Sequence, residues 1–286
     1  MKNRFVKSHG LGNDYIVIDS EDTSFPINSN TAKRICDVHY GIGSDGLLVK
    51  VPSNKTDFKV EMYNPDGSKF EKSGNGLRIF SKYIYDYGFT QNKIFSIQTD
   101  GGNVKSEIIE VVNSKATVIK VDMGQADFNC RTLSVDIVNQ EYINELLQIN
   151  DRQFYVNAVS MGNPHCVVFR NKIDKDEIIK YGPFIENNPI FLNRTNVQFV
   201  VQRSRNLADI LIWERGVGFT NASGTSSCAV AAILKKLDKM DNKITIRMPG
   251  GLLDIKITDD FKLTMTGEVR QIAQGIFSDE LIRDLI

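Results

Sequence analysis

An internal repeat constrains the architecture of this chain more than any other sequence feature. Three short glycine-containing pairs occur in the same order in both halves, each displaced by 149 or 150 residues. They are Gly12–Asn13 with Gly162–Asn163, Ser73–Gly74 with Ser223–Gly224, and Gly101–Gly102 with Gly250–Gly251. One such pair recurs easily by chance, whereas three ordered pairs at one spacing indicate a duplicated unit. The 286 residues are therefore expected to form two similar domains.

Each half combines strands with one well-marked helix. Alternating apolar residues over 58–63 predict a strand, and Asn64–Gly67 predicts a turn after it. Helical spacing of apolar residues begins just after Ser73, and again just after Ser223. We therefore expect an α+β fold of two pseudo-symmetric domains with a cleft between them. In each domain a curved, mostly antiparallel sheet would surround a central helix that is apolar nearly all round.

Further elements complete this prediction. Hairpins are expected around Asn113–Ser114 and around Asp259–Asp260, and additional surface helices over Glu141–Asn150 and Asp174–Tyr181. The predicted domains are residues 1–122, to which residues 272–286 return, and residues 123–271.

Charge and cysteine usage argue against several classes of protein. The 35 basic residues balance 35 acidic residues, so no broad positive field favours nucleic acid or an anionic membrane as a partner. Charged residues interrupt the N-terminal segment, and no apolar run approaches the roughly 18 residues of a membrane-spanning helix, so a cytoplasmic location is expected. The four cysteines, Cys36, Cys130, Cys166 and Cys228, include no closely spaced pair and are expected to be reduced and buried.

The two predicted central helices begin at equivalent glycine-containing loops. The start of a helix carries backbone N–H groups without an intrahelical partner and about half a positive charge. Two such starts facing one cleft would bind a small anion such as a carboxylate, with Ser73 and Ser223 on opposite sides of it. That arrangement suits chemistry on two faces of one carbon atom. Either serine taken alone is more simply explained as an ordinary N-cap, because serine is among the preferred residues there.

Seven separated motifs together resemble those of the diaminopimelate epimerases. They are His9-Gly-Leu-Gly-Asn13-Asp-Tyr15, Gly41-Ile-Gly-Ser-Asp-Gly46, Asn64-Pro-Asp-Gly67-Ser68, Ser73-Gly-Asn-Gly76, Ser160-Met-Gly-Asn-Pro-His165-Cys166, Glu214-Arg-Gly-Val-Gly218 and Met248-Pro-Gly-Gly251. The resemblance covers nearly the whole chain and implies two pseudo-symmetric domains with the active site between them, and neither pyridoxal phosphate nor a metal. In that family one cysteine removes the α-proton of diaminopimelate and a second returns a proton on the opposite face. This interconverts the LL and meso forms for lysine and peptidoglycan precursor synthesis.

The resemblance also assigns roles to residues of this chain. The substrate-holding positions would be Asn13, Asn64, Gly74, Asn75, Asn163, Asn196, Glu214, Arg215, Gly224 and Thr225. The backbone N–H groups of Gly74–Asn75 and Gly224–Thr225 would cradle the reacting carboxylate, and the planar fork of Arg215 would grip a carboxylate. His165 would assist the first catalytic position and Glu214 the second, as hydrogen-bonding bases. Each asparagine alone, or a lone histidine, also fits an ordinary structural role.

The chain departs from the family pattern at the chemistry itself. The family has cysteine where this chain has Ser73 and Ser223, and a hydroxyl is a far weaker acid than a thiol with a reference pKa of about 8.5. If each proton transfer contributes about 10²- to 10⁴-fold, loss of both thiols removes most of the activity while binding survives. Deliberate replacement of two thiols explains this pattern. Natural divergence explains it too, because Phe219, Ser226 and Ile79 stand where the family usually has glutamate, glycine and cysteine.

Three functions stay open at this level. The first is a diaminopimelate epimerase, either competent or in an impaired or inactive Cys-to-Ser form. The second is a catalytically silent amino-acid-binding homologue, and the third is a related isomerase or lyase that uses His165 or Glu214 as its base. In each case a small amino acid is the expected partner, and the family resemblance is compatible with a homodimer.

Overall fold

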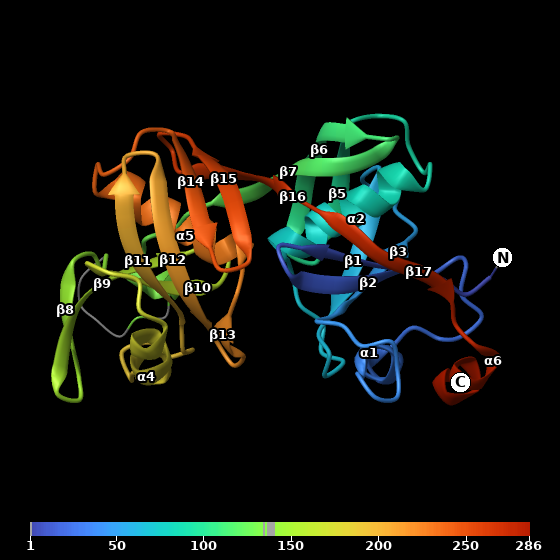
Figure 1. Cartoon of the computed structure of the whole chain (residues 1–286), viewed down its shortest axis with the longest axis horizontal. Coiled ribbons are helices and arrows are strands. Elements are labelled where there is room, and N and C mark those ends of the chain that lie inside the picture. The colour runs from blue at the N-terminus through green and yellow to red at the C-terminus, as the bar shows by residue number, and fades with distance from the viewer. Residues whose placement is uncertain (1, 134, 136–140) are drawn as a thin grey trace. The chain divides into compact units, whose positions relative to one another are not determined.

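The protein is described by a computed structural model covering residues 2–133, 135 and 141–286. The chain divides into two compact units, the first formed by Met1–Asp122 with Gly267–Ile286 and the second by Met123–Thr266. In Figure 1 the strands of one unit curve around helix α2 (Gly74–Asp86), and those of the other curve around helix α5 (Gly224–Lys236). The predicted α+β class is confirmed. No helix in the described ranges is long and apolar enough to cross a bilayer.

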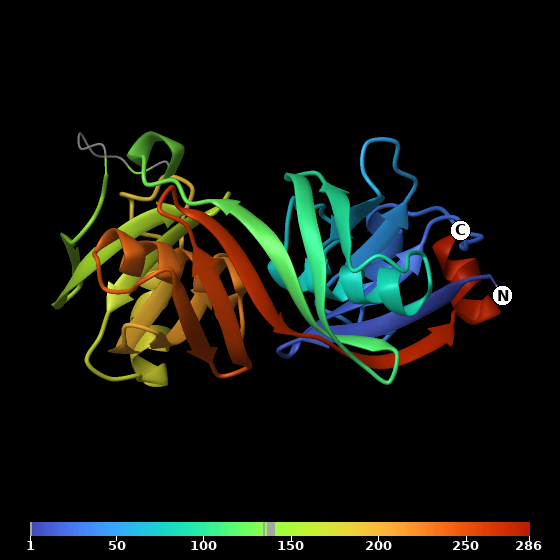
Figure 2. The same cartoon turned by 90° about the horizontal axis from the view of Figure 1, so that it is seen from above.

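The first unit alternates antiparallel and parallel neighbours. Its strands are β1 (Arg4–Gly10), β2 (Asn13–Asp19), β3 (Leu47–Val51), β4 (Phe58–Tyr63), β5 (Ile94–Thr99), β6 (Gly102–Val112), most of β7 (Lys115–Gln125) and β17 (Arg270–Ile276). Its other helices are α1 (Ser29–Cys36) and α6 (Asp279–Leu285). From β1 to β7, consecutive pairs run antiparallel, parallel, antiparallel, parallel, antiparallel and antiparallel. Strand β17 returns antiparallel to β1, as Figure 2 shows.

The second unit repeats this order of pairings. Its strands are β8 (Glu145–Ile149), β9 (Arg152–Ser160), β10 (Pro164–Phe169), β11 (Asn196–Ser204), β12 (Leu207–Glu214), β13 (Gly218–Thr220), β14 (Lys243–Met248), β15 (Gly251–Ile257) and most of β16 (Lys262–Glu268). Its other helices are α3 (Cys130–Leu133) and α4 (Lys175–Glu186). The pairs β9–β10, β10–β11, β11–β12, β12–β14, β14–β15 and β15–β16 alternate as in the first unit. Since α4 and α5 occupy the crossovers that α1 and α2 occupy there, the predicted pseudo-symmetry is confirmed.

The two central helices match in length and in their caps. Each has 13 residues, and their N-caps Ser73 and Ser223 have φ/ψ angles of −136°/125° and −147°/127°. Helix α5 buries a nearly continuous apolar surface, as predicted. Helix α2 is as deeply buried but not apolar all round, because it carries Arg78 and Lys82 into the interior. The Lys82 ammonium donates to the carbonyl of Ala116 at 2.6 Å, which offsets its burial.

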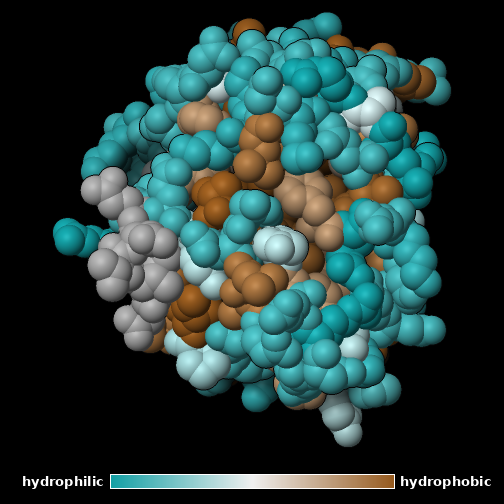
Figure 3. Space-filling model, turned by 90° about the vertical axis from the view of Figure 1, so that its left-hand side faces the viewer, coloured by the Kyte–Doolittle hydropathy of each residue, from teal (hydrophilic) through white to brown (hydrophobic). Residues whose placement is uncertain are grey.

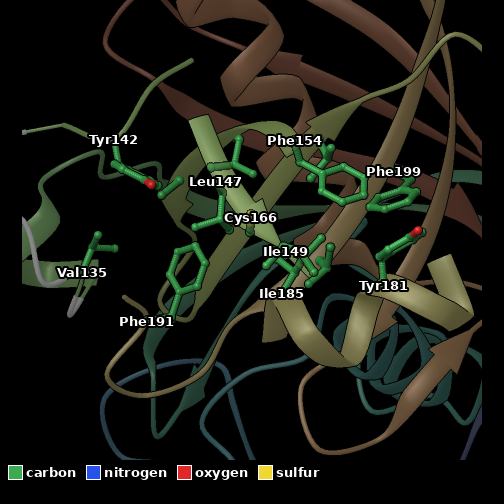
Figure 4. Packing of buried hydrophobic residues seen from close by; sticks show 14 of the residues in the cluster. Val135, Tyr142, Leu147, Ile149, Phe154, Cys166, Tyr181, Ile185, Phe191 and Phe199 are labelled. Atoms are coloured by element: carbon green, nitrogen blue, oxygen red, sulfur yellow. The ribbon is translucent and has the colours of Figure 1, made fainter. Parts of the chain in front are cut away.

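One predicted helix is a strand. Residues 145–149, within the segment predicted as a helix over Glu141–Asn150, form β8 and pair antiparallel with β9. Leu147 and Ile149 are buried and point into the core cluster in Figure 4, whereas Leu146 and Gln148 are exposed. This period of two is that of a strand at a surface, and pairing with β9 overrides the local helical spacing. The face in Figure 3, at the β8 end of the unit, mixes hydrophobic and hydrophilic residues.

The other predicted surface helix is confirmed and is longer than expected. Helix α4 begins after its N-cap Asp174, whose carboxylate accepts from the backbone N–H groups of Asp176 and Glu177, and it runs to Glu186. Tyr181 and Ile185 on this helix point into the cluster that also contains Phe154 and Phe199 (Figure 4). The α4 backbone is therefore fixed to the core of the second unit.

Candidate active site

The N-cap of α2 is Ser73, whose side chain binds a backbone N–H in the first turn of the helix. The Ser73 hydroxyl oxygen accepts from the backbone N–H of Gly76 at 3.1 Å, and it also accepts from the Tyr15 hydroxyl at 3.4 Å. The earlier N–H groups of a helix, here those of Gly74 and Asn75, have no intrahelical partner by geometry. This start can therefore bind an anion beside the Ser73 hydroxyl.

A directed chain of hydrogen bonds fixes the amides next to this helix start. The fully buried Arg78 guanidinium donates to Asn75 Oδ1 at 2.7 Å, and Asn75 Nδ2 donates to Asn13 Oδ1 at 3.1 Å. Asn13 Nδ2 then donates to the Asp45 carboxylate at 2.9 Å. Since a guanidinium can only donate and a carboxylate can only accept, the charged ends set the orientation of both amides. The structure thus brings Asn13, Asn75 and Ser73 together in the first unit.

Arg78→Met is expected to lower the free energy of unfolding by about 3 kcal/mol, because it removes a buried donor and leaves the Asn75 carbonyl oxygen without its partner. Urea denaturation measures this difference. Lys105→Met, at an exposed position of β6, is the matched control and should change stability by less than about 0.5 kcal/mol. Equal stability of the two variants would contradict the role given to the Arg78 chain.

The start of α5 repeats the geometry in the second unit. The Ser223 hydroxyl accepts from the backbone N–H of Ser226 at 3.4 Å and lies 3.3 Å from the Thr225 hydroxyl. The Ser223 carbonyl accepts from both the backbone N–H and the hydroxyl of Ser227. The N–H groups of Gly224 and Thr225 occupy the positions of Gly74 and Asn75 in α2.

The third repeated glycine pair supports these helix starts. Gly101 N–H donates to the carbonyl of Glu71 at 3.1 Å, and Gly250 N–H donates to the carbonyl of Asn221 at 2.9 Å. Each acceptor lies two residues before a capping serine. The repeat seen in the sequence therefore reflects a shared support for the two loops.

His165 is a buried, neutral group in the second unit. Its Nδ1 lies 3.1 Å from Gln198 Nε2, and its Nε2 lies 2.9 Å from Asn163 Oδ1. Burial first, and the positive charge of Arg215 second, lower the pKa of His165 to about 3. Gln198 Nε2 also donates to the Ser226 hydroxyl at 3.0 Å. With these amide orientations His165 accepts at Nδ1 and donates from Nε2, so it holds Asn163 in place.

Asn196 and Arg215 are joined directly. Asn196 Oδ1 accepts from the backbone N–H of Arg215 at 2.9 Å, and Asn196 Nδ2 donates to the carbonyl of Pro164 at 2.9 Å. The Arg215 guanidinium donates to the carbonyl of Asn193 at 3.0 Å. Glu214, opposite Gly218 in the β12–β13 pair, precedes this turn. Asn163, Asn196, Glu214 and Arg215 thus belong to one region of the second unit.

Asn64 lies in the turn after β4. Its Nδ2 donates to the Ser68 hydroxyl at 2.9 Å, and its backbone N–H donates to the Ser68 carbonyl. In the described part of the chain, these hydrogen bonds stay inside the turn and do not join Asn64 to Ser73. Its part in binding stays a prediction.

Several supporting residues escaped sequence reasoning. Gln198 and Glu186 are buried polar groups with partners far away in the sequence, and Arg78 is a buried charge that donates to Asn75 one helical turn earlier. The sequence assigned no role to Asp45, which lies in the Gly41–Gly46 motif, or to Ser226, which stands where the family usually has glycine. A charged residue at a core-facing position of a helix is the sequence signal that could have identified such a residue. Arg78, between Leu77 and Ile79, is an example, because a buried charge needs a specific partner.

The four cysteines are buried and form no disulfide bond, as predicted. Burial raises the pKa of Cys36 to about 11 and also raises the pKa values of Cys130 and Cys166. These three thiols are protonated at neutral pH and do not supply a ready thiolate.

Comparison with known proteins agrees with the motifs and the topology. The family model for diaminopimelate epimerase matches residues 5–129 and 157–272. Diaminopimelate epimerase 2 of a Nostoc species is 44% identical over 97% of this chain and 96% of its own length. Diaminopimelate epimerase of Alkaliphilus metalliredigens is 34% identical over 99% of this chain and 100% of its own length.

One solved structure has a fold similar to that of this chain. A probable proline racemase from Agrobacterium radiobacter superposes with a TM-score of 0.73 at 12% identity, covering 97% of this chain and 93% of its own. At that identity the likeness concerns the fold alone. The family model and the two relatives cover nearly the whole sequence, and the chain therefore belongs to the diaminopimelate epimerase family.

Proposed function

We propose that this chain binds diaminopimelate and that Ser73 and Ser223 occupy the two proton-transfer positions of a cofactor-independent epimerase. One observation carries the proposal: each unit contains a central helix of the same length, started by a serine with the same cap geometry. In this proposal the two helix starts hold one ligand from opposite faces of its α-carbon. Because hydroxyls replace thiols, binding is retained while proton transfer is slow.

The remaining residues are assigned to the carboxylate and ammonium groups of the ligand according to whether they donate or accept hydrogen bonds. The N–H groups of Gly74, Asn75, Gly224 and Thr225 bind the reacting carboxylate, since helix starts favour anions. Arg215 binds a second carboxylate, and the oxygens of the asparagines and Glu214 accept from ammonium groups. Asn13, Asn64, Asn163 and Asn196 complete this set.

Within this scheme His165 positions Asn163 and does not move a proton. Both its ring nitrogens are hydrogen-bonded inside the protein, and its lowered pKa keeps it a very weak base. Glu214 is then the carboxylate assigned to assist at Ser223. The finer cellular picture is also part of the proposal: a cytoplasmic protein, as the sequence leads us to expect, and a homodimer, from the family resemblance alone.

Exchange in deuterated water tests the function. LL-diaminopimelate is incubated with the protein, and the α-proton signal and the stereochemistry are followed by NMR. Slow exchange with inversion is expected. Binding without any exchange would mean a silent binding protein, and elimination products would mean a lyase, and either result would overturn the epimerase assignment.

Lysine is expected to bind at least about tenfold more weakly than diaminopimelate, because it lacks the second carboxylate and leaves the Arg215 guanidinium without its ligand partner. Titration calorimetry of both ligands at one ionic strength measures the ratio. Comparable affinities would contradict the assigned substrate while leaving the fold unaffected.

A further inference from the structure

A buried carboxylate stands behind the Arg215 turn. Glu186, the last residue of α4, is 4% exposed. One of its oxygens accepts from the backbone N–H of Gly216 at 2.9 Å and from Arg194 at 3.1 Å. The other accepts from the indole N–H of Trp213 at 2.7 Å. The donors therefore come from both sides of Glu214 and Arg215.

A buried carboxylate at the last residue of α4 is unfavourable for the helix itself. The C-terminal end of a helix carries partial negative charge, and burial of a carboxylate costs several kcal/mol unless donors satisfy it. Arg194 supplies only part of the compensation, because its side chain is 53% exposed. The donors Trp213, at the end of β12, and Gly216, in the turn, are therefore the main reason that a buried carboxylate is tolerated here.

The support for Glu186 is rigid. The preceding Ile185 points into the core cluster with Tyr181 (Figure 4). A Cβ atom at Gly182 would lie 2.7 Å from the Trp213 ring, so the indole packs directly on the helix backbone. The carbonyl of Glu186 also accepts from the backbone N–H of Thr195, next to Asn196. Glu186 therefore binds next to both partners of the Asn196–Arg215 hydrogen bond. Its carbonyl accepts from Thr195, beside Asn196, and its carboxylate accepts from Gly216, beside Arg215.

We propose that Glu186 is a positioning residue that fixes the Glu214–Gly216 turn, and thereby sets the affinity for the carboxylate bound by Arg215. The ligand part of this inference rests on the proposed function. The structural part concerns the Gly216 N–H and stands without any ligand. Removal of the acceptor would leave the Gly216 N–H and the Trp213 indole N–H without their protein partner, and the turn would shift to pair them with water.

Three variants test the proposal. Glu186→Met keeps the length of the side chain but removes both acceptors, and it is expected to weaken diaminopimelate binding by about tenfold or more while changing lysine binding by less than about threefold. Glu186→Gln keeps one oxygen for Gly216 and Arg194 and loses only the acceptor of the Trp213 indole, so its affinity should stay within about threefold of that of the unaltered protein. Arg194→Gln is the matched control, since it removes the exposed partner of the same carboxylate, and it should leave both affinities unchanged.

Amide hydrogen exchange of Gly216 separates this inference from the proposed function. Faster exchange in Glu186→Met than in Glu186→Gln is expected whether or not diaminopimelate binds. If Glu186→Met does not fold, Glu186→Asp replaces it, because a carboxylate shortened by one methylene cannot reach both Trp213 and Gly216. Unchanged Gly216 exchange, or equal losses for diaminopimelate and lysine, would overturn the proposal. Failure of the unaltered protein to bind diaminopimelate would overturn the function alone.

Discussion

Ser73→Cys combined with Ser223→Cys is expected to raise the epimerisation rate by about 10³-fold or more. Each thiol has a reference pKa of about 8.5, and the helix start beside it lowers that value further, whereas the hydroxyl of serine remains protonated. Each proton transfer contributes about 10²- to 10⁴-fold, and inversion needs a competent base on one face with a competent acid on the other. The measurement is the rate of LL to meso conversion at saturating diaminopimelate.

The single variants and the affinity supply the controls. Ser73→Cys or Ser223→Cys alone should help much less than the pair, because one face still carries a hydroxyl. Diaminopimelate affinity should change little, since backbone N–H groups hold the reacting carboxylate. Ser73→Ala with Ser223→Ala should show no gain in rate. If the double cysteine variant binds diaminopimelate yet neither exchanges nor inverts its α-proton, nearby substitutions such as Phe219 have altered the site, and the family's activity does not transfer.

The sequence was most informative where structure depends on local chemistry. A serine followed by glycine caps a helix, and glycine pairs lie at the turns between hairpin strands, so their recurrence at one spacing predicts the repeated topology. The same local chemistry identified α2 and α5, because their caps satisfy backbone groups within three residues. The starts of the two site helices were therefore predictable from the sequence.

Long-range pairing was beyond such reasoning. Residues 145–149 became a strand because β9 offers an edge, which no local spacing reveals. Gln198 and Glu186 fix site residues through partners brought close only by the folded chain, and Arg78 fixes Asn75 one helical turn away from within the core. Their burial could not be read from residue type, since charged and amide side chains are usually exposed.

Acid is expected to destabilise the second unit through His165. Its pKa is about 3 in the folded protein, because burial and the nearby Arg215 disfavour the charged ring, against about 6.5 for an ordinary histidine. Between these two pH values the unfolded chain binds a proton that the folded chain does not. Stability therefore rises with pH across this window, is fully present above about pH 6.5, and is lost progressively as the pH falls toward 3.

His165→Gln isolates this contribution, because an amide keeps hydrogen-bonding capacity toward Asn163 and Gln198 but does not titrate. Between pH 7.5 and pH 4.5, the unaltered protein should lose about 2 to 3 kcal/mol more of its unfolding free energy than the variant, since about two pKa units of the shift are traversed. Urea denaturation of both proteins at each pH gives the difference, and titrations common to both cancel in it. Parallel stability curves for the two proteins would mean that the pKa of His165 is close to 6.5 in the folded state as well. The ring could then serve as a base, and its assignment as the residue that holds Asn163 would fail.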